Sequence, residues 1–313
     1  MDERTLPPPP PAAGTEYCYR HPDVATGVHC TRCARPICPD CMVPAPVGYQ
    51  CPTCVGDARR DYRRGPGRQV AVANAKGVSL TMVTLIVLFA VFVFEIVRGG
   101  SEMLVNPSGQ ALFDLGASQG YAIAYGEWWR MVSAIFLHAG VLHLLLNAWG
   151  LYLFGTVVER QTYGRVRFVV IFLVSGFIGN VVSFVIGSPA SPQEVFVPGV
   201  GASGAIFGMV GAVFVYAFLR RGTPIGRTYL NWAITIIVLN VVIGQSVGGI
   251  DNLAHLGGAV GGALCAVSAE LLGRRGRAPA LEWLGYAAIV AAGVVLTIQH
   301  ASAIRDAFPP GLL

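Results

Sequence analysis

The feature that most constrains this chain is a series of long apolar segments that begins near residue 78 and continues almost to the C-terminus. A helix needs roughly 17–25 apolar residues to cross the hydrocarbon core of a bilayer. Seven segments meet this requirement, at about 78–97, 137–158, 166–187, 203–220, 229–247, 253–272 and 281–299. Composition agrees, since 12% of the 313 residues are charged, against about 25% in soluble domains. We therefore predict an all-α polytopic membrane protein, a bundle of seven transmembrane helices.

The parts outside these segments differ in composition. Residues 1–14 are Pro-rich and polar, so we expect a disordered leader; they lack the apolar core of a cleaved signal peptide. Residues 15–56 are cysteine-rich and 57–77 form a basic juxtamembrane linker, while 300–313 form a tail beyond the last span. The stretch 98–136 is too mixed to span, and we expect a structured interfacial loop there.

Basic residues orient the predicted bundle. They are concentrated before the first span and after the second, fourth and sixth, at Arg59, Arg60, Arg63, Arg64, Arg68, Lys76, Arg160, Arg165, Arg167, Arg220, Arg221, Arg227, Arg274, Arg275 and Arg277. The alternate loops contain only Arg98 and Arg130. Because Lys and Arg accumulate in cytoplasmic loops, we predict a cytoplasmic N-terminus and an external C-terminus.

In that orientation the second, fourth and sixth spans carry polar residues near their outer ends. His143 and Asn147 are four apart and share a helix face. Ser203 opens the fourth span in "GASG", and His255 lies near the start of the sixth. Glycines in the fourth and sixth spans would allow close backbone approach. A serine becomes a nucleophile when a base such as histidine takes its proton, and fixed donors stabilise the oxyanion that forms. The polar residues of these spans therefore indicate a hydrolytic enzyme.

These motifs together resemble the rhomboid intramembrane serine proteases. They are "WR" at Trp129 and Arg130, "H-x4-H-x3-N" at His138, His143 and Asn147, "GASG" at 201–204 and "AHLGGAVGG" at 254–262. The resemblance covers roughly 78–299, and the extra span after the sixth resembles the "six plus one" arrangement of part of the family.

The resemblance implies an intramembrane serine endopeptidase that cleaves transmembrane protein segments near their outer ends and admits them sideways from the membrane lipid. It implies a Ser203–His255 dyad without an acidic third member or a catalytic cofactor. It also implies an oxyanion site of His143, Asn147 and the Ser203 backbone, supported by His138, Gly201, Gly204, Phe207, Trp129 and Arg130. Phe207 stands where some bacterial members carry a tyrosine on which the histidine can stack.

The N-terminal part contains four pairs of candidate metal ligands, each pair separated by two residues: Cys18 and His21, Cys30 and Cys33, Cys38 and Cys41, and Cys51 and Cys54. Two four-coordinate zinc sites would use all eight. The tight spacing favours a cross-brace in which alternate pairs share an ion, and the module resembles B-box-like zinc fingers. His29 could replace His21, and an iron–sulfur site is the minor alternative. A disulfide framework fits poorly with a cytoplasmic segment.

Three other functions remain to be weighed. A catalytically inactive relative would bind transmembrane clients, although such proteins usually lack the serine or the histidine. A transporter would predict internal repeats and charges at mid-depth, which the sequence does not contain. The main role of the protein could also be that of a scaffold built on the zinc module, with proteolysis as a secondary role. We expect a bacterial plasma membrane location, a cytoplasmic protein partner for the zinc finger and no nucleic-acid partner.

Overall fold

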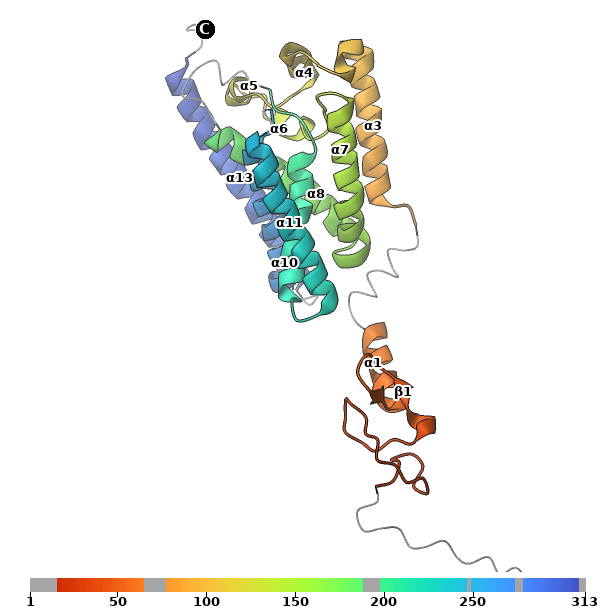
Figure 1. Cartoon of the computed structure of the whole chain (residues 1–313). Coiled ribbons are helices and arrows are strands. Elements are labelled where there is room, and N and C mark those ends of the chain that lie inside the picture. Colours follow the sequence, from red (N-terminus) through yellow and green to blue (C-terminus); the bar gives the residue numbers. More distant parts are fainter. Residues whose placement is uncertain (1–15, 65–76, 188–197, 247–248, 274–277, 310–313) are drawn as a thin grey trace, which may run out of the picture. The chain divides into compact units, whose positions relative to one another are not determined.

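The computed structural model describes residues 16–64, 77–187, 198–246, 249–273 and 278–309 (Figure 1). The chain divides into two compact units, Met1–Gln69 and Val70–Leu313, which we treat separately. The leader predicted at 1–14, most of the linker predicted at 57–77 and the end of the tail lie outside the described residues.

The first unit is small and has little regular structure. It contains the short helix η1 (Pro39–Cys41), an antiparallel pair of two-residue strands, β1 (Val43–Pro44) and β2 (Tyr49–Gln50), and helix α1 (Pro52–Arg64). In the part of this unit that the structure describes, the buried core consists of one isoleucine and five cysteines: Ile37, Cys18, Cys30, Cys38, Cys41 and Cys51. Helix α1 crosses residue 56, where the sequence suggested a boundary between finger and linker.

The second unit is a helical bundle. Its long helices are α3 (Leu80–Gly99), α7 (Val141–Gly150), α8 (Arg165–Ile186), α10 (Ser203–Leu219), α11 (Pro224–Ser246), α12 (Asn252–Val267) and α13 (Pro279–Ala307). Helix α7 continues through the π-helical segments η3 (Leu151–Gly155) and η4 (Val157–Thr162), and α12 continues through η5 (Ser268–Leu272). Helix α13 extends beyond residue 299, where the sequence suggested the last span ends.

Six of the described helices are long and apolar enough to cross a membrane, counting α7 and α12 with their π-helical continuations. Helix α10 is equally apolar but has 17 residues. An all-α polytopic membrane bundle is therefore confirmed. The number of spans and the orientation of the termini stay predictions.

Four short helices connect α3 to α7: η2 (Ser101–Leu104), α4 (Gly109–Leu115), α5 (Gly120–Ala124) and α6 (Arg130–Ser133). Arg130 holds this connection together, because its buried guanidinium donates to the carbonyls of Phe113 and Ala117 at 2.6 and 3.2 Å. Its Nε also donates to the Glu127 carboxylate at 2.7 Å. One side chain thus ties α4 to α6.

Polar contacts fasten the outer helices of the bundle to the rest. The buried Glu159 carboxylate accepts from the backbone N–H groups of Leu80 and Thr81, each at 2.8 Å, and so caps the start of α3. Arg167 of α8 forms an ion pair with Glu282 of α13, with Nη2 and Oε2 2.8 Å apart. A charge is costly in an apolar bundle unless it is paired in this way.

Helices α10 and α12 pack through glycines so closely that no side chain fits between them. A Cβ atom on Gly258 would lie 1.9 Å from the carbonyl oxygen of Gly204, and one on Gly262 would lie 1.9 Å from that of Gly208. Helix α8 joins the same contact, since a Cβ atom on Gly179 would lie 2.7 Å from the Ala254 oxygen. Small residues at such interfaces let backbones approach directly.

We expect Gly258→Ala to destabilise the bundle by about 1–3 kcal/mol, because the added methyl forces the two backbones apart. Gly222→Ala is the control, since no atom lies within 4 Å of its Cβ position, and it should change stability by less than about 0.5 kcal/mol. Unfolding of both variants in detergent, followed by circular dichroism, measures the difference. Equal stability of the two variants would contradict the close packing.

Candidate active site

Ser203 is the first residue of α10 and is half-buried. The preceding loop reaches it through Gly201, whose φ of +127° favours glycine. The loop is fixed by a backbone hydrogen bond from Gly201 N to the Ala134 oxygen at 2.9 Å. As the first residue of a helix, Ser203 lies among backbone N–H groups that have no partner within the helix and favour negative charge.

His143 and Asn147 lie one turn apart on α7, and the ring of His143 faces the loop before Ser203. A Cβ atom on Gly201 would lie 2.8 Å from His143 Nε2 and 3.7 Å from Ser203 Oγ. The other ring nitrogen, Nδ1, accepts from the Ala139 N–H at 3.2 Å. A neutral ring that accepts at Nδ1 carries its proton on Nε2. His143 therefore presents an N–H donor towards the loop that contains Ser203.

Asn147 is buried, and its Nδ2 donates to the His143 carbonyl oxygen at 2.9 Å. An amide nitrogen carries two hydrogens, so this bond uses one of the two donors. Both polar side chains of α7 are thus oriented by hydrogen bonds to their own segment.

His255 is buried on α12, and its ring stacks on Phe207 of α10, with centroids 4.4 Å apart and an interplanar angle of 20°. Its Nδ1 lies 2.9 Å from Nδ2 of Asn240 on α11. The residues adjacent to Ser203 and His255 touch each other, since a Cβ atom on Gly204 would lie 3.2 Å from the Ala254 oxygen. The serine and the histidine therefore lie on neighbouring turns of two closely packed helices.

Among the described residues, no hydrogen bond joins Ser203 Oγ to the His255 ring. Contacts of this kind are often long in enzymes without substrate and shorten in the reacting complex. The structure brings His143 against the loop before Ser203, and it packs the residue after Ser203 against the residue before His255.

The structure also shows where three other residues singled out from the sequence lie: His138, Trp129 and Arg130. His138 is fully buried, and its ring lies 5.3 Å from that of His143. Trp129 is 53% exposed and packs beside the Arg130 guanidinium, 4.7 Å from its ring centroid. Both tryptophan and arginine belong to the connection between α3 and α7, so they position the loop rather than touch Ser203.

Glu95 is a residue that the sequence analysis missed. It is fully buried on α3, and its carboxylate accepts from the backbone N–H of His138 at 3.2 and 3.3 Å. It thereby fixes the loop that enters α7. The available signal was a single acidic residue within an otherwise uncharged apolar segment, which usually marks a buried polar contact.

The first unit gathers the eight predicted ligand residues into two groups. The ligand atoms of Cys18, His21, Cys38 and Cys41 all lie within 4.8 Å of one another, and so do those of Cys30, Cys33, Cys51 and Cys54. The first and third pairs of the sequence thus lie together, as do the second and fourth. His29 lies elsewhere, with its ring paired to Glu16.

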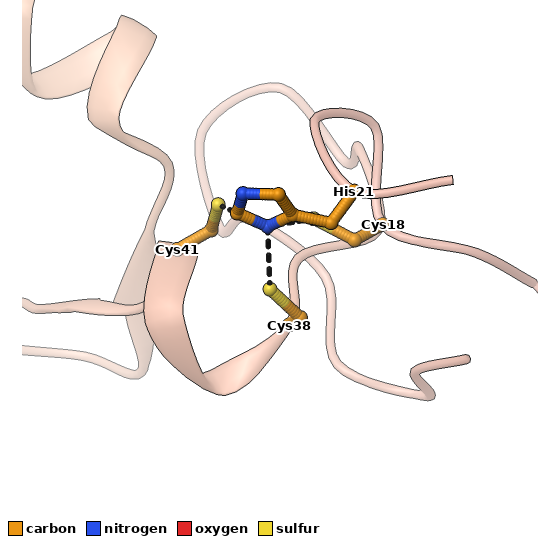
Figure 2. A group of neighbouring side chains, drawn as sticks. All are labelled: Cys18, His21, Cys38 and Cys41. Carbon is orange, nitrogen blue, oxygen red and sulfur yellow. Dashed lines mark hydrogen bonds between the residues drawn. The ribbon is translucent and has the colours of Figure 1, made fainter. Parts of the chain in front are cut away.

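The first group has the dimensions of a metal site. His21 Nδ1 lies 3.1 Å from Cys38 Sγ, 3.5 Å from Cys41 Sγ and 3.9 Å from Cys18 Sγ (Figure 2). Tetrahedral zinc, with bonds of about 2.0–2.3 Å, separates its ligand atoms by roughly 3.3–3.8 Å, so these separations lie within about 0.2 Å of that range. In Figure 2 the imidazole of His21 lies beside the sulfurs of Cys38 and Cys41, and a dashed line joins its ring to Cys38.

The second group is also chemically suited to a metal. Cys33 Sγ and Cys51 Sγ lie 3.8 Å apart, and the Cys51 N–H donates to Cys30 Sγ at 3.2 Å. Desolvation raises the pKa of the Cys30 thiol, but hydrogen bonds from backbone N–H groups outweigh it and lower that pKa to about 6. A thiolate is the form that binds metal. Both groups can therefore hold a metal ion.

Comparison with known proteins identifies the class to which this bundle belongs. Residues 125–269 match the rhomboid domain family, a range that contains Ser203, His255, His143 and Asn147. The chain is 41% identical over 180 residues to "Rhomboid protease GluP" of Bacillus subtilis, covering 58% of this chain and 32% of that protein. It is 39% identical over 142 residues to "Putative rhomboid protease YdcA" of the same organism, covering 45% and 67%.

A plant protein shows the same similarity: "RHOMBOID-like protein 7" of Arabidopsis thaliana is 35% identical over 170 residues, covering 52% of this chain and 50% of that one. The chain thus spans about a third of GluP, half of the plant protein and two thirds of YdcA. It belongs to the rhomboid family of intramembrane proteases and is an integral membrane protein.

Gly201→Ala should disturb the loop before Ser203 in two ways. The alanine would be strained at a φ of +127°, which costs of order 1–3 kcal/mol, and its methyl would press on the His143 ring. Gly199→Ala is the control, because its Cβ position meets only Ser118 atoms at 3.8 Å and beyond. We expect a lower melting temperature in detergent for Gly201→Ala alone. Equal melting temperatures would contradict the loop geometry.

Proposed function

We propose that this protein is an active intramembrane serine endopeptidase with a Ser203–His255 dyad. The observation that carries the proposal is the close approach of Gly204 to the Ala254 backbone, since Ser203 and His255 are the neighbours of these residues in the sequence. Family membership supports the reaction class, and the stacking of His255 on Phe207 supports a fixed ring orientation.

In the proposed reaction Ser203 Oγ attacks the carbonyl carbon of a peptide bond while His255 takes the hydroxyl proton. The negative charge that develops on the carbonyl oxygen accepts hydrogen bonds from His143 Nε2–H, Asn147 Nδ2–H and the Ser203 backbone N–H. The C–N bond then breaks, and His255 gives its proton to the leaving amine. Water releases the acyl group from Ser203 by the same proton transfers in reverse. No catalytic cofactor takes part.

The donors proposed for the oxyanion are supported by two contacts. The bond from Ala139 N to His143 Nδ1 puts the ring proton on Nε2, and Asn147 keeps one amide hydrogen after donating to the His143 oxygen. Removing one such donor typically costs 10²–10³-fold in rate. Gly201, without a side chain, leaves the space between His143 and Ser203 open.

The substrates we propose are transmembrane segments of other membrane proteins, cut near the outer face of the membrane. A continuous helix hides its carbonyls in hydrogen bonds, so helix-destabilising residues near the cleavage site are expected. We place the N-terminus and the first unit in the cytoplasm, the C-terminus outside, and the protein in a bacterial plasma membrane. The excess of arginine in alternate loops supports this orientation.

A rhomboid-like protein without catalysis, which binds transmembrane clients, is the alternative. It is less well supported, because this chain contains both Ser203 and His255 within the matched domain.

For the first unit we propose two structural zinc ions, one in each group of four ligands, and a role in docking a cytoplasmic protein. Structural zinc supplies about 10–16 kcal/mol to small domains at neutral pH. The sulfur and nitrogen ligand sets and their separations support zinc in the first site, and the four cysteines support it in the second.

Labelling of the detergent-solubilised protein with a fluorophosphonate tests the dyad. We expect the wild-type protein to be labelled and Ser203→Ala to lose labelling completely. His255→Ala should slow it by about 10²–10⁴-fold, the usual contribution of a general base. Mass spectrometry of the labelled peptide identifies the modified residue.

Ser183→Ala is a suitable control for this experiment, since that hydroxyl bonds to Asp251 rather than to the candidate dyad. Labelling that persists in Ser203→Ala, or equal rates in wild type and His255→Ala, would rule out the dyad.

Metal analysis of the purified full-length chain tests the first unit. We expect two zinc ions per chain in the wild type and one in the double variant Cys38→Ser/Cys41→Ser, which removes half the ligands of the first group. Cys265→Ala, buried on α12 outside both groups, should keep two. Fewer than two zinc ions in the wild type, or no loss in the double variant, would contradict the assignment.

A further inference from the structure

Asn240 is the polar residue of α11 that contacts the His255 ring. Its amide nitrogen lies 2.9 Å from His255 Nδ1, whereas the face of the ring is covered by Phe207. Stacking thus sets the plane of the ring, and one hydrogen bond sets its rotation within that plane. Nε2 is the nitrogen left to exchange a proton with Ser203.

Only one of the two ring nitrogens can accept the serine proton, because the other already carries a hydrogen. A neutral imidazole carries one proton, on Nδ1 or on Nε2. A general base that acts through Nε2 needs its proton on Nδ1, and the group facing Nδ1 decides which form predominates. An asparagine amide suits this position, because its oxygen and nitrogen have similar sizes. A half-turn of the amide places Oδ1 where Nδ2 lies, without backbone movement.

We propose that Asn240 is a positioning residue that accepts the Nδ1–H of His255 through Oδ1 and so keeps Nε2 as the proton acceptor for Ser203. When His255 takes the serine proton on Nε2, the same hydrogen bond stabilises the positive ring. Asn240 of α11 then has the role that an acidic residue has in other serine hydrolases, which is to accept the Nδ1–H of the histidine. This inference rests on the proposed function, since it assigns Asn240 a part in that reaction.

An ordinary interhelical hydrogen bond is the competing explanation for Asn240. The chain offers a matched control, because a second asparagine joins the same two helices without touching the ring. Asn252 of α12 donates through Nδ2 to the Gly244 oxygen of α11 at 2.8 Å. If helix joining were all that mattered, the two asparagines would respond alike to substitution.

Rates of fluorophosphonate labelling separate the two explanations. We expect Asn240→Leu, which keeps the volume and loses the acceptor, to slow labelling by at least about tenfold, a part of the 10²–10⁴-fold that a general base contributes. Asn240→Asp, which keeps an oxygen acceptor, should stay within about threefold of wild type. Asn252→Leu should label as wild type does when its fold is intact by circular dichroism.

Two results would overturn the proposal. If Asn240→Leu labels at the wild-type rate, the amide is dispensable. If Asn240→Asp is as slow as Asn240→Leu, the amide acts as a donor through Nδ2 and not as an acceptor.

The tautomer itself can be observed without activity. Nitrogen NMR of histidine-labelled protein in detergent, with His255→Gln to assign the signals, should show His255 protonated at Nδ1 in the wild type and in Asn240→Asp. In Asn240→Leu the protons should be shared between Nδ1 and Nε2. A wild-type ring protonated at Nε2 refutes the proposal. If the tautomer is as expected but Ser203 is not labelled, the proposed protease function fails while the hydrogen bond stands, so the two failures are distinguishable.

Discussion

The direct backbone contact between α10 and α12 is the constraint on which the rest of the bundle depends. Gly258 and Gly262 lie against the carbonyl oxygens of Gly204 and Gly208 with no room for a Cβ atom. Lipid tails are as apolar as the helix surfaces, so burial of apolar area does little to join helices in a bilayer, and close packing has to do so. The same contact brings the residues beside Gly204 and Ala254 together. In this bundle, the glycines that allow the close packing also lie beside the two residues of the proposed dyad.

The buried polar groups that fix the loops and helix ends of the bundle act differently, through paired contacts. Glu159 caps α3, Arg130 ties α4 to α6, and Glu95 receives the His138 N–H. An unpaired polar group in such surroundings costs several kcal/mol. These contacts therefore specify where the loops and helix ends lie, while the glycines specify how closely the central helices approach. The site around Ser203 depends on both, since His143 follows the loop that Glu95 fixes.

The sequence predicted those features that depend on one segment at a time. Apolar length predicted the helices, and spacing along α7 placed His143 and Asn147 on one face. Partners on different helices could not be predicted in this way. Asn240 lies on α11 and His255 on the next helix, α12. Periodicity within α11 indicates only that a polar residue occurs there. Glu95 was missed for the same reason. The resemblance to a family implied the relation between Ser203 and His255, because a set of motifs in a known order carries three-dimensional information that periodicity lacks.

The two units of the chain obtain their stability from different sources. In the bundle, helices of up to 29 residues pack against one another over long faces. Among the described residues of the first unit, the buried side chains are one isoleucine and five cysteines, all five of which belong to the two ligand groups. A core made of ligands contributes little hydrophobic stabilisation of its own, since small domains bury too little apolar surface to fold without additional constraints. Metal bound by the two ligand groups would supply folding energy that this small core lacks.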